Sequence, residues 1–291
     1  MAQDFYGAEW GALRRTPPFG GWRRIVAVFL AALLLMVATV ARANWEVRNT
    51  QLVETTFVTD ELAGELRVVQ ITDFHNLPRP SQVAQIVELV RGAQPDLIAL
   101  TGDFVNTSSD DLGPVEQLVK ELATIDAPRF YVDGNHDKGE RMQDRLHGLL
   151  ERYGVRVLAN EHLFFDGDFG EVQLVGVDDY YSEHGDLGAA VAGLPDDGFR
   201  LVLTHSPDIL PELDTYGVDY AICGHTHGGQ IRLPVIGPLY QAGGDYFPRI
   251  SKGVYTEGDA TLFVDSGVGV TGPQVRFLNQ SQVTLHRIIP G

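Results

Sequence analysis

Strand-like and helix-like segments alternate along the first half of this chain, and this alternation restricts its possible folds more than any other feature. Each of three short apolar runs is followed by an amphipathic stretch with helical spacing: residues 66–72 by 80–92, residues 96–100 by 115–123, and residues 129–133 by 140–153. Strand–helix–strand repeats form layered α/β domains in which helices cover a sheet. We therefore predict an α/β fold for this region.

After Val155 the pattern changes to short strands separated by turns rich in Gly and Asp. We predict these strands at residues 171–177, 200–204, 218–223, 261–264 and 283–289, and an edge strand or hairpin within residues 44–64. The sequence contains no repeat of fixed period and no low-complexity linker between the two halves. A second sheet packed on the first, with helices outside, accounts for both halves in one domain.

Side chains that can bind metal follow the predicted strands at their carboxyl ends. They comprise two carboxylates, one amide and four imidazoles: Asp73, Asp103, Asn135, His75, His205, His225 and His227. Ligand-binding residues of α/β sheets gather at the carboxyl ends of the strands, so these side chains should converge. They are too many for one tetrahedral ion and suit two ions that share a carboxylate. Mixed oxygen and nitrogen ligands without a thiolate favour two divalent transition-metal ions, namely Mn, Fe, Zn or Ni.

Other polar residues of the chain lack such companions. Four histidines stand apart from any second candidate ligand and are expected at the surface: His147, His162, His184 and His286. The adjacent carboxylates Asp178 and Asp179 could supply acid–base chemistry, but we interpret them as part of a turn.

Residues 1–43 have the features of a signal peptide or a transmembrane anchor rather than of the folded domain, which we place at residues 44–291. An uncharged apolar run at residues 25–41 is at the short limit for crossing a bilayer, and Ala41-Arg42-Ala43 matches a signal-cleavage pattern. Four arginines precede the run: Arg14, Arg15, Arg23 and Arg24. Such arginines stay in the cytoplasm and direct the following chain across the membrane.

Two locations follow from this segment. We expect a single-span anchor in the cytoplasmic membrane, with the folded domain facing the periplasm or the exterior. Cleavage near Ala43 would instead release a secreted or periplasmic protein.

The charge of the chain argues against nucleic acid as a partner. The formal net charge is −17, with 39 acidic and 22 basic residues, and an anionic surface repels phosphate backbones. The single cysteine, Cys223, cannot form an internal disulfide.

The candidate ligands belong to motifs that together resemble the five-motif signature of the calcineurin-like metallophosphoesterases. The motifs are Asp73-x-His75, Gly102-Asp103, Gly134-Asn-His-Asp137, His205 and Gly224-His-Thr-His227. Residues 228–234, 266–269 and 276–277 are similar to an exported or membrane-attached branch that includes UDP-diacylglucosamine hydrolase-like enzymes.

The resemblance implies a four-layer αββα sandwich of two mixed sheets with a centre of two metal ions. By motif position, one ion would be held by Asp73, His75 and His227, and the other by Asn135, His205 and His225. Asp103 would bridge the two ions, and His136 would be a general acid rather than a ligand.

One position departs from the pattern of the phosphoprotein phosphatases in this superfamily. There a carboxylate three residues after the bridging Asp orients the catalytic His, whereas this chain has Asn106. Asp137 is an alternative partner, so His136 and Asp137 are the candidate catalytic residues.

These observations favour a metal-dependent hydrolase of a phosphomono- or phosphodiester. The expected mechanism is in-line attack by a metal-bridging hydroxide, with His136 protonating the leaving oxygen. The substrate could be lipid-linked or nucleotide-linked, because the loop at residues 234–250 is rich in Gly, Pro and aromatic residues. One alternative is a UDP-diacylglucosamine pyrophosphate hydrolase, acting on a lipid A precursor at the membrane. Another is a non-catalytic metal-containing binding protein, although such a protein would have no need of His136.

Overall fold

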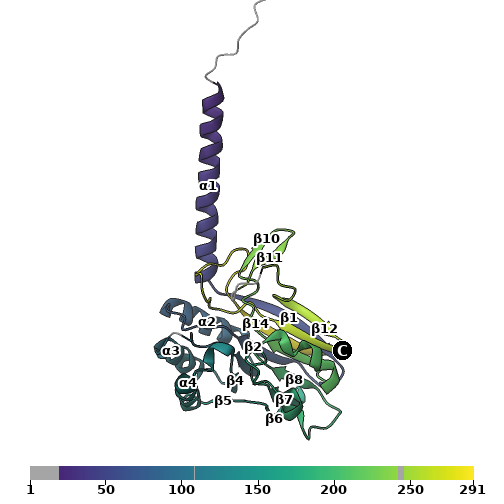
Figure 1. Cartoon of the computed structure of the whole chain (residues 1–291). Coiled ribbons are helices and arrows are strands. Elements are labelled where there is room, and N and C mark those ends of the chain that lie inside the picture. The colour runs from purple at the N-terminus through teal and green to yellow at the C-terminus, as the bar shows by residue number, and fades with distance from the viewer. Residues whose placement is uncertain (1–19, 108, 242–245) are drawn as a thin grey trace, which may run out of the picture. The chain divides into compact units, whose positions relative to one another are not determined.

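The computed structural model describes residues 20–107, 109–241 and 246–291 (Figure 1). Arg14 and Arg15, which contribute to the predicted orientation in the membrane, lie outside these residues. The chain divides into two units, Met1–Ala41 and Arg42–Gly291.

The first helix, α1 (Gly20–Arg48), contains the apolar run. Its leucines at positions 34 and 35 are exposed, as are most of the apolar side chains that precede them in the helix. Among the described residues, α1 alone is long and apolar enough to span a membrane. The prediction of strand or hairpin from residue 44 is wrong at its start, because helix continues to Arg48 and β1 (Gln51–Thr59) follows. Helical spacing of Ala43 and Val47, both buried in the second unit, explains this continuation.

Two six-stranded mixed sheets form the second unit. The first sheet has the order β1–β14–β2–β3–β4–β5, with β14 (Gln282–Pro290), β2 (Leu66–Ile71), β3 (Leu97–Thr101), β4 (Arg129–Val132) and β5 (Val155–Val157). Strands β2 to β5 are parallel, and β14 runs antiparallel to β2.

The second sheet has the order β12–β13–β9–β8–β7–β6, with β12 (Gly253–Glu257), β13 (Ala260–Val264), β9 (Tyr220–Cys223), β8 (Arg200–Leu203), β7 (Gly170–Gly176) and β6 (Glu161–Gly167). Its four central strands are parallel and its two outer strands are antiparallel to their neighbours.

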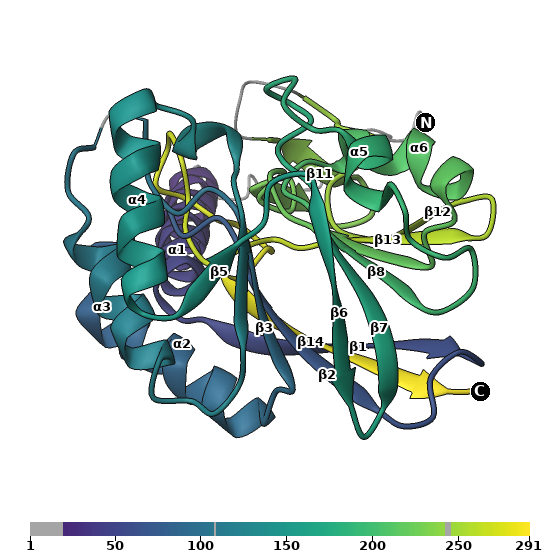
Figure 2. The ribbon, with the colours of Figure 1, turned by 90° about the horizontal axis from the view of Figure 1, so that it is seen from below.

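Helices cover the outer face of each sheet (Figure 2). The first sheet is covered by α2 (Pro80–Ala93), α3 (Gly113–Leu122) and α4 (Glu140–Arg152), and the second by α5 (Leu187–Val191) and α6 (Leu210–Leu213). Short 3-10 helices lie at Pro207–Ile209 and Asp214–Tyr216. The layers that Figure 2 shows are those of the predicted αββα sandwich.

Alternation within the strands produces the layers. In β2, Val69 and Ile71 pack under the helices, whereas Leu66 and Val68 pack between the sheets. β9 likewise directs Tyr220 and Ile222 between the sheets and its other two residues toward α5 and α6. Because successive residues of a strand point to opposite faces, a continuous apolar run produces a strand buried on both sides.

The sequence did not predict several short or polar strands. These are β5, β6, β12 and a separate hairpin of β10 (Ile231–Leu233) and β11 (Gly237–Tyr240). Four of them have only three to five residues, and β6 has seven residues of mixed exposure, so they carry too little periodicity to be recognised.

The surface position predicted for His286 is wrong, because this residue of β14 is buried between the sheets. Tyr220 Oη lies 2.8 Å from Nδ1 of His286, and Oε1 of Gln70 lies 3.1 Å from its Nε2. Burial lowers the pKa of His286 to about 3. The neutral ring therefore accepts from Tyr220 and donates to Gln70. His147 is partly buried and bonds to Asp133, and His162 is partly buried and bonds to the Ala190 carbonyl, whereas His184 is exposed as predicted.

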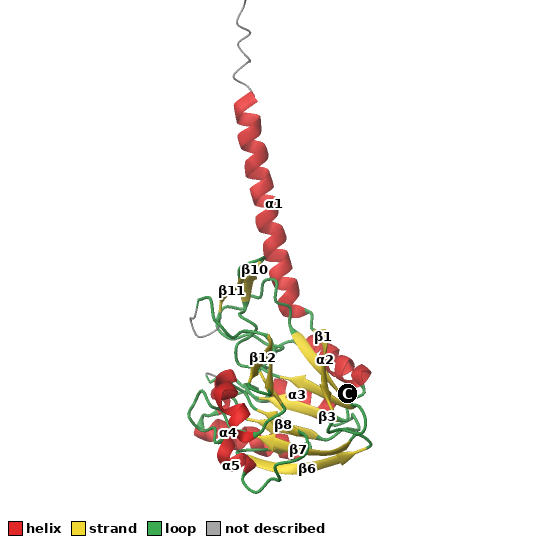
Figure 3. Ribbon diagram, turned by 90° about the vertical axis from the view of Figure 1, so that its right-hand side faces the viewer, coloured by secondary structure: helices red, strands yellow, loops and turns green. Residues whose placement is uncertain are grey.

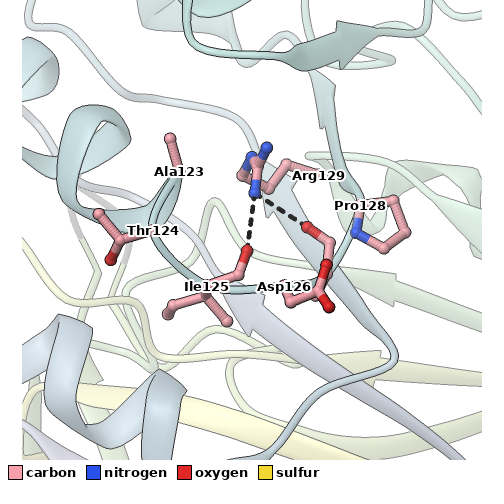
Figure 4. Close-up of a pocket in the computed structure, with 7 residues that line it drawn as sticks. Ala123, Thr124, Ile125, Asp126, Pro128 and Arg129 are labelled. Atoms are coloured by element: carbon pink, nitrogen blue, oxygen red, sulfur yellow. Dashed lines mark hydrogen bonds between the residues drawn. The ribbon is translucent and has the colours of Figure 1, made fainter.

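The loop between α3 and β4 surrounds a shallow pocket of about 530 Å³ (Figure 4). Nη1 of Arg129 donates to the carbonyl oxygens of Ile125 and Ala127 at 3.2 and 2.9 Å, which closes the end of α3 onto the start of β4. This pocket lies at the amino end of β4, whereas the candidate ligands follow the carboxyl ends of the strands.

Candidate metal centre

The candidate ligands lie in the loops that leave β2, β3, β4, β8 and β9. Five of them have a positive φ, between 48° and 70°: Asp73, His75, Asp103, His225 and His227. Residues other than glycine adopt a positive φ at an energetic cost, and residues in this conformation concentrate at functional sites. The loops therefore turn sharply at the ligands and direct them into one place.

The first group consists of Asp73, His75 and His227, whose nearest donor atoms all lie within 4.8 Å of one another. Nε2 of His75 is 3.1 Å from Nε2 of His227, and Oδ1 of Asp73 is 3.5 Å from the latter atom. All three residues are buried. The loops that follow β2 and β9, which are far apart in the sequence, supply this group.

The second group consists of Asp103, His205 and His225, again within 4.8 Å of one another. Nδ1 of His205 lies 2.8 Å from the carbonyl oxygen of Thr101 and donates to it, so its Nε2 is left as an acceptor. Oδ1 of Asn135 is 2.9 Å from Nδ1 of His225 and places the predicted amide ligand beside this group.

Asp103 lies between the two groups. Its Oδ2 is 3.5 Å from Nε2 of His75 and 3.2 Å from Nε2 of His205. Its Oδ1 accepts from the backbone N–H of His136 at 2.8 Å, which fixes the carboxylate in this orientation. The glycine before Asn135 allows this approach, because a Cβ at Gly134 would come within 2.3 Å of the same carboxylate.

The donor atoms of both groups fit divalent metal ions. Two buried side-chain atoms that face the other candidate ligands have no hydrogen-bond partner: Asp73 Oδ1 and His205 Nε2. Buried polar atoms are nearly always paired, and a cation would satisfy the carboxylate and imidazole atoms that face one another. Burial lowers the pKa of His75 and of His225 to about 4, so both rings are neutral near pH 7 and keep a lone pair for a metal.

Asp137 makes different contacts from those that the sequence suggested. It ends a short 3-10 helix, Asn135–Asp137, and its carboxylate accepts from four backbone N–H groups and one hydroxyl. The donors are Asp103, Phe104, Val105 and Gly134 of the backbone, and Tyr131 Oη. Asp137 is therefore not the partner that orients the His136 ring. It ties the loop after β3 to the loop after β4.

His136 is oriented by a residue that the sequence analysis missed. The hydroxyl of Thr107 lies 2.9 Å from Nδ1 of His136. Asn106, which stands where the related phosphatases have a carboxylate, donates instead from Nδ2 to the carbonyl oxygen of His75 at 2.9 Å. The His136 ring meets the His75 ring edge to face, with centroids 5.0 Å apart.

The pair Asp178 and Asp179, which we predicted to be part of a turn, directly precedes one, and Oδ2 of Asp179 accepts from the N–H of Ser182 within it. Both carboxylates are nevertheless buried: Asp178 pairs with Lys138 at 2.5 Å, and Oδ1 of Asp179 has no protein partner. The turn also places the ring of Tyr181 on that of His225, with centroids 4.7 Å apart. This segment therefore borders the second group.

Arg276 and Asn279 form hydrogen bonds to the backbone near the first group. The buried Arg276 donates from Nη2 to the carbonyl oxygens of Ser266 and Gly269, both at 2.6 Å. Asn279 donates from Nδ2 to the carbonyl oxygen of His227 at 2.7 Å. Only the resemblance of residues 266–269 and 276–277 to known enzymes drew attention to this region of the sequence.

Comparison with known proteins places this geometry in a family context. The model of the calcineurin-like phosphoesterase family matches residues 66–229. The metallophosphoesterase YkoQ of Bacillus subtilis is 29% identical over 270 residues, which cover 88% of this chain and 97% of YkoQ. The metallophosphoesterase YkuE of the same organism is 27% identical, covering 75% of this chain and 77% of YkuE. The phosphodiesterase YaeI of Escherichia coli is 29% identical, covering 71% of this chain and 76% of YaeI.

Proposed function

Because the chain belongs to the calcineurin-like phosphoesterase family and is a metal-dependent phosphoric ester hydrolase, we propose that it uses two metal ions to hydrolyse a phosphomono- or phosphodiester. Asp73, His75 and His227 would hold one ion, and Asn135, His205 and His225 the other. The observation that carries this proposal is the position of Asp103 Oδ2, between His75 of one group and His205 of the other.

Two divalent ions, when bound, supply Lewis acidity toward a phosphoryl oxygen and make water a nucleophile near neutral pH. The chain supplies the remaining functions. His136 stands beside the first group, with Nδ1 bonded to Thr107. A protonated ring would donate from Nδ1 to Thr107 and keep the proton on Nε2 for the leaving oxygen. Without that proton an alkoxide would have to leave as an anion, which is the slow step for esters of weakly acidic alcohols.

The proposed location is the cytoplasmic membrane, with the catalytic unit outside. Support comes from the exposed apolar surface of α1 and from the arginines that precede it in the sequence. Cleavage near Ala43 would leave a periplasmic enzyme. A catalytic unit on the cytoplasmic side would instead favour hydrolysis of a nucleotide-linked lipid precursor such as UDP-diacylglucosamine.

Metal removal and return test the proposal. The full-length protein in detergent is treated with a chelator, dialysed, and assayed on p-nitrophenyl phosphate and bis(p-nitrophenyl) phosphate. Hydrolysis should be lost and then restored by Mn, Fe, Zn or Ni, with elemental analysis giving close to two ions per chain at full activity. Full activity at one ion per chain would contradict the two-ion proposal. Activity that survives complete metal removal would contradict the two-ion proposal and metal-dependent hydrolysis as well.

A further inference from the structure

The hairpin of β10 and β11 grows directly out of the first metal group. β10 starts four residues after His227, and Nη1 of Arg232 on this strand donates back to the carbonyl oxygen of Gly228 at 2.8 Å. Gly229 packs so closely on Pro238 of β11 that an added Cβ would come within 2.4 Å of its ring. The hairpin is therefore in direct contact with the segment that follows His225 and His227.

The turn at the tip of this hairpin is apolar and exposed. Val235 is fully exposed, with a relative exposure of 107%, and Ile236 beside it is 59% exposed. Val235 also has a φ of 68°, a conformation that turns normally assign to Gly, Asn or Asp because a β-branched side chain adopts it at a cost. Two exposed aliphatic side chains at a strained turn indicate that the tip meets an apolar surrounding.

Further exposed apolar side chains lie next to the hairpin. Tyr246 pairs with Tyr240 of β11, and the backbone N–H of Phe247 donates to the carbonyl oxygen of Leu239. On the other side, Phe277 exchanges backbone hydrogen bonds with β10, which places the exposed Leu278 beside it. We call this set the apolar ridge: Val235, Ile236, Tyr246, Phe247, Leu278 and Trp45.

The ridge is continuous with the end of α1 that belongs to the second unit. The backbone N–H of Asn279, next to Leu278, donates to Oε2 of Glu46 at 3.1 Å, and that of Ser281 donates to the carbonyl oxygen of Glu46 at 3.0 Å. Trp45 precedes Glu46 and is exposed. Figure 3 shows β10 and β11 at the same end of the catalytic unit as the label of β1.

The charge around the ridge is opposite to that of the protein. Residues 228–252 contain three basic residues and one acidic residue, in a chain whose net charge is −17. The basic residues are Arg232, Arg249 and Lys252, of which Arg249 is exposed. Basic residues attract the headgroups of anionic lipids, and Trp and Tyr concentrate at the interface between lipid and water.

We propose that the apolar ridge enters the surface of the anionic bilayer that α1 spans, so that the hairpin holds the metal centre at the level of the lipid headgroups. This inference rests on the proposed membrane attachment and catalysis, and it assigns the substrate class: phosphoesters of lipids within the membrane. Lipid contact releases the cost of exposing Val235 and Ile236, and the hairpin carries this contact to the His225–His227 loop.

Three variants, each with one introduced cysteine, test the contact. Cys223 is buried and is the only cysteine, so an introduced thiol on the surface can be labelled selectively. Full-length Ile236→Cys, carrying an environment-sensitive nitrobenzoxadiazole dye, is placed in nanodiscs of phosphatidylethanolamine and phosphatidylglycerol, with and without nitroxide-labelled lipid. Val58→Cys on β1 is the matched control, since Val58 is 57% exposed and Ile236 is 59% exposed. Leu34→Cys reports insertion of α1.

The dye at position 236 should emit at shorter wavelength and be quenched by the nitroxide lipid, whereas the dye at position 58 should respond to neither. Equal behaviour at positions 236 and 58, with quenching at position 34, would overturn the ridge proposal alone. Absence of quenching at position 34 would overturn the proposed membrane attachment as well.

Activity provides a second readout. The double variant Val235→Asp, Ile236→Asp should lose hydrolysis of a phospholipid presented in the nanodisc several-fold more than hydrolysis of bis(p-nitrophenyl) phosphate. An equal loss on both substrates would mean that the tip supports the metal loop without contacting lipid. A wild-type protein inactive on the soluble ester would instead overturn the proposed catalytic function.

Discussion

The hydroxyl of Thr107 lies 2.9 Å from Nδ1 of His136, on the far side of the ring from its free edge. In the phosphoprotein phosphatases of the same superfamily, a carboxylate at the position of Asn106 has the orienting role. Here Asn106 bonds to the backbone of His75, and the next residue orients the imidazole. A hydroxyl fixes the orientation of the ring through a neutral hydrogen bond, whereas a carboxylate would add a negative charge beside it.

Replacing Thr107 by Val should weaken catalysis without removing metal. The loss of one neutral hydrogen bond costs about 1 kcal/mol, which corresponds to roughly a fivefold lower kcat on an alkyl phosphoester. Thr107→Ser keeps the hydroxyl and should retain most of the activity. Steady-state kinetics and elemental analysis of the three proteins decide the matter. If the Ser variant loses as much activity as the Val variant, the hydroxyl has no orienting role.

His136→Asn should discriminate between leaving groups. An alkoxide needs a proton to leave whereas nitrophenolate does not, so the variant should lose roughly 10²–10⁴-fold on an alkyl phosphoester and far less on a nitrophenyl ester. The ratio of kcat values on the two substrates is the measurement. Equal losses would mean that the His136 side chain does not protonate the leaving oxygen, since the backbone hydrogen bond from residue 136 to Asp103 is retained in the variant.

Asp103→Asn should lower the metal content of the protein. Its carboxylate lies between the two groups, and an amide oxygen is a weaker ligand than a carboxylate. Elemental analysis after gel filtration should fall from about two ions per chain to fewer. Asp133→Asn provides a control, because Asp133 is a buried carboxylate after β4 that pairs with Lys138 and His147 instead. A metal content equal to that of the wild type in Asp103→Asn would contradict the bridging role.

His286 should contribute to the acid sensitivity of the fold. Its pKa falls from the ordinary 6.5 to about 3 on burial, so between these pH values the unfolded chain binds a proton that the native protein does not. The free energy of unfolding should therefore decrease as pH falls below 6.5, by up to about 1.4 kcal/mol per pH unit from this group. His286→Gln removes the titrating ring and should show a shallower decrease in urea unfolding of the detergent-solubilised protein. Parallel curves for the two proteins would show that His286 does not set this dependence.

Protease added to intact spheroplasts should digest the catalytic unit. The arginines before the apolar run favour an amino terminus in the cytoplasm, which leaves residues 42–291 outside. Immunoblotting against the catalytic unit follows the digestion, and a cytoplasmic marker protein confirms that the spheroplasts are intact. Protection until the membrane is lysed would reverse the proposed topology and favour a nucleotide-linked lipid precursor as substrate.

The sequence by itself determined the layered fold and the set of candidate metal-binding side chains. Both are local signals, because burial on two faces makes an apolar run, as in Leu97–Thr101, and a ligand directly follows the strand that positions it, as Asp103 follows β3. The family motifs added the division of these ligands between two ions, which is still a proposal.

The tertiary structure decided which polar atoms meet. Thr107 contacts His136 across 29 positions of sequence, and Tyr220 contacts His286 across 66, so neither contact leaves a periodic trace. Asp137 was interpreted as a partner of His136 because it is adjacent in sequence, yet the packing of two loops gives its carboxylate five other donors. Local periodicity encodes which face of a helix or strand is buried. Hydrogen bonds between loops depend instead on how the layers are stacked, and only the folded chain fixes this stacking.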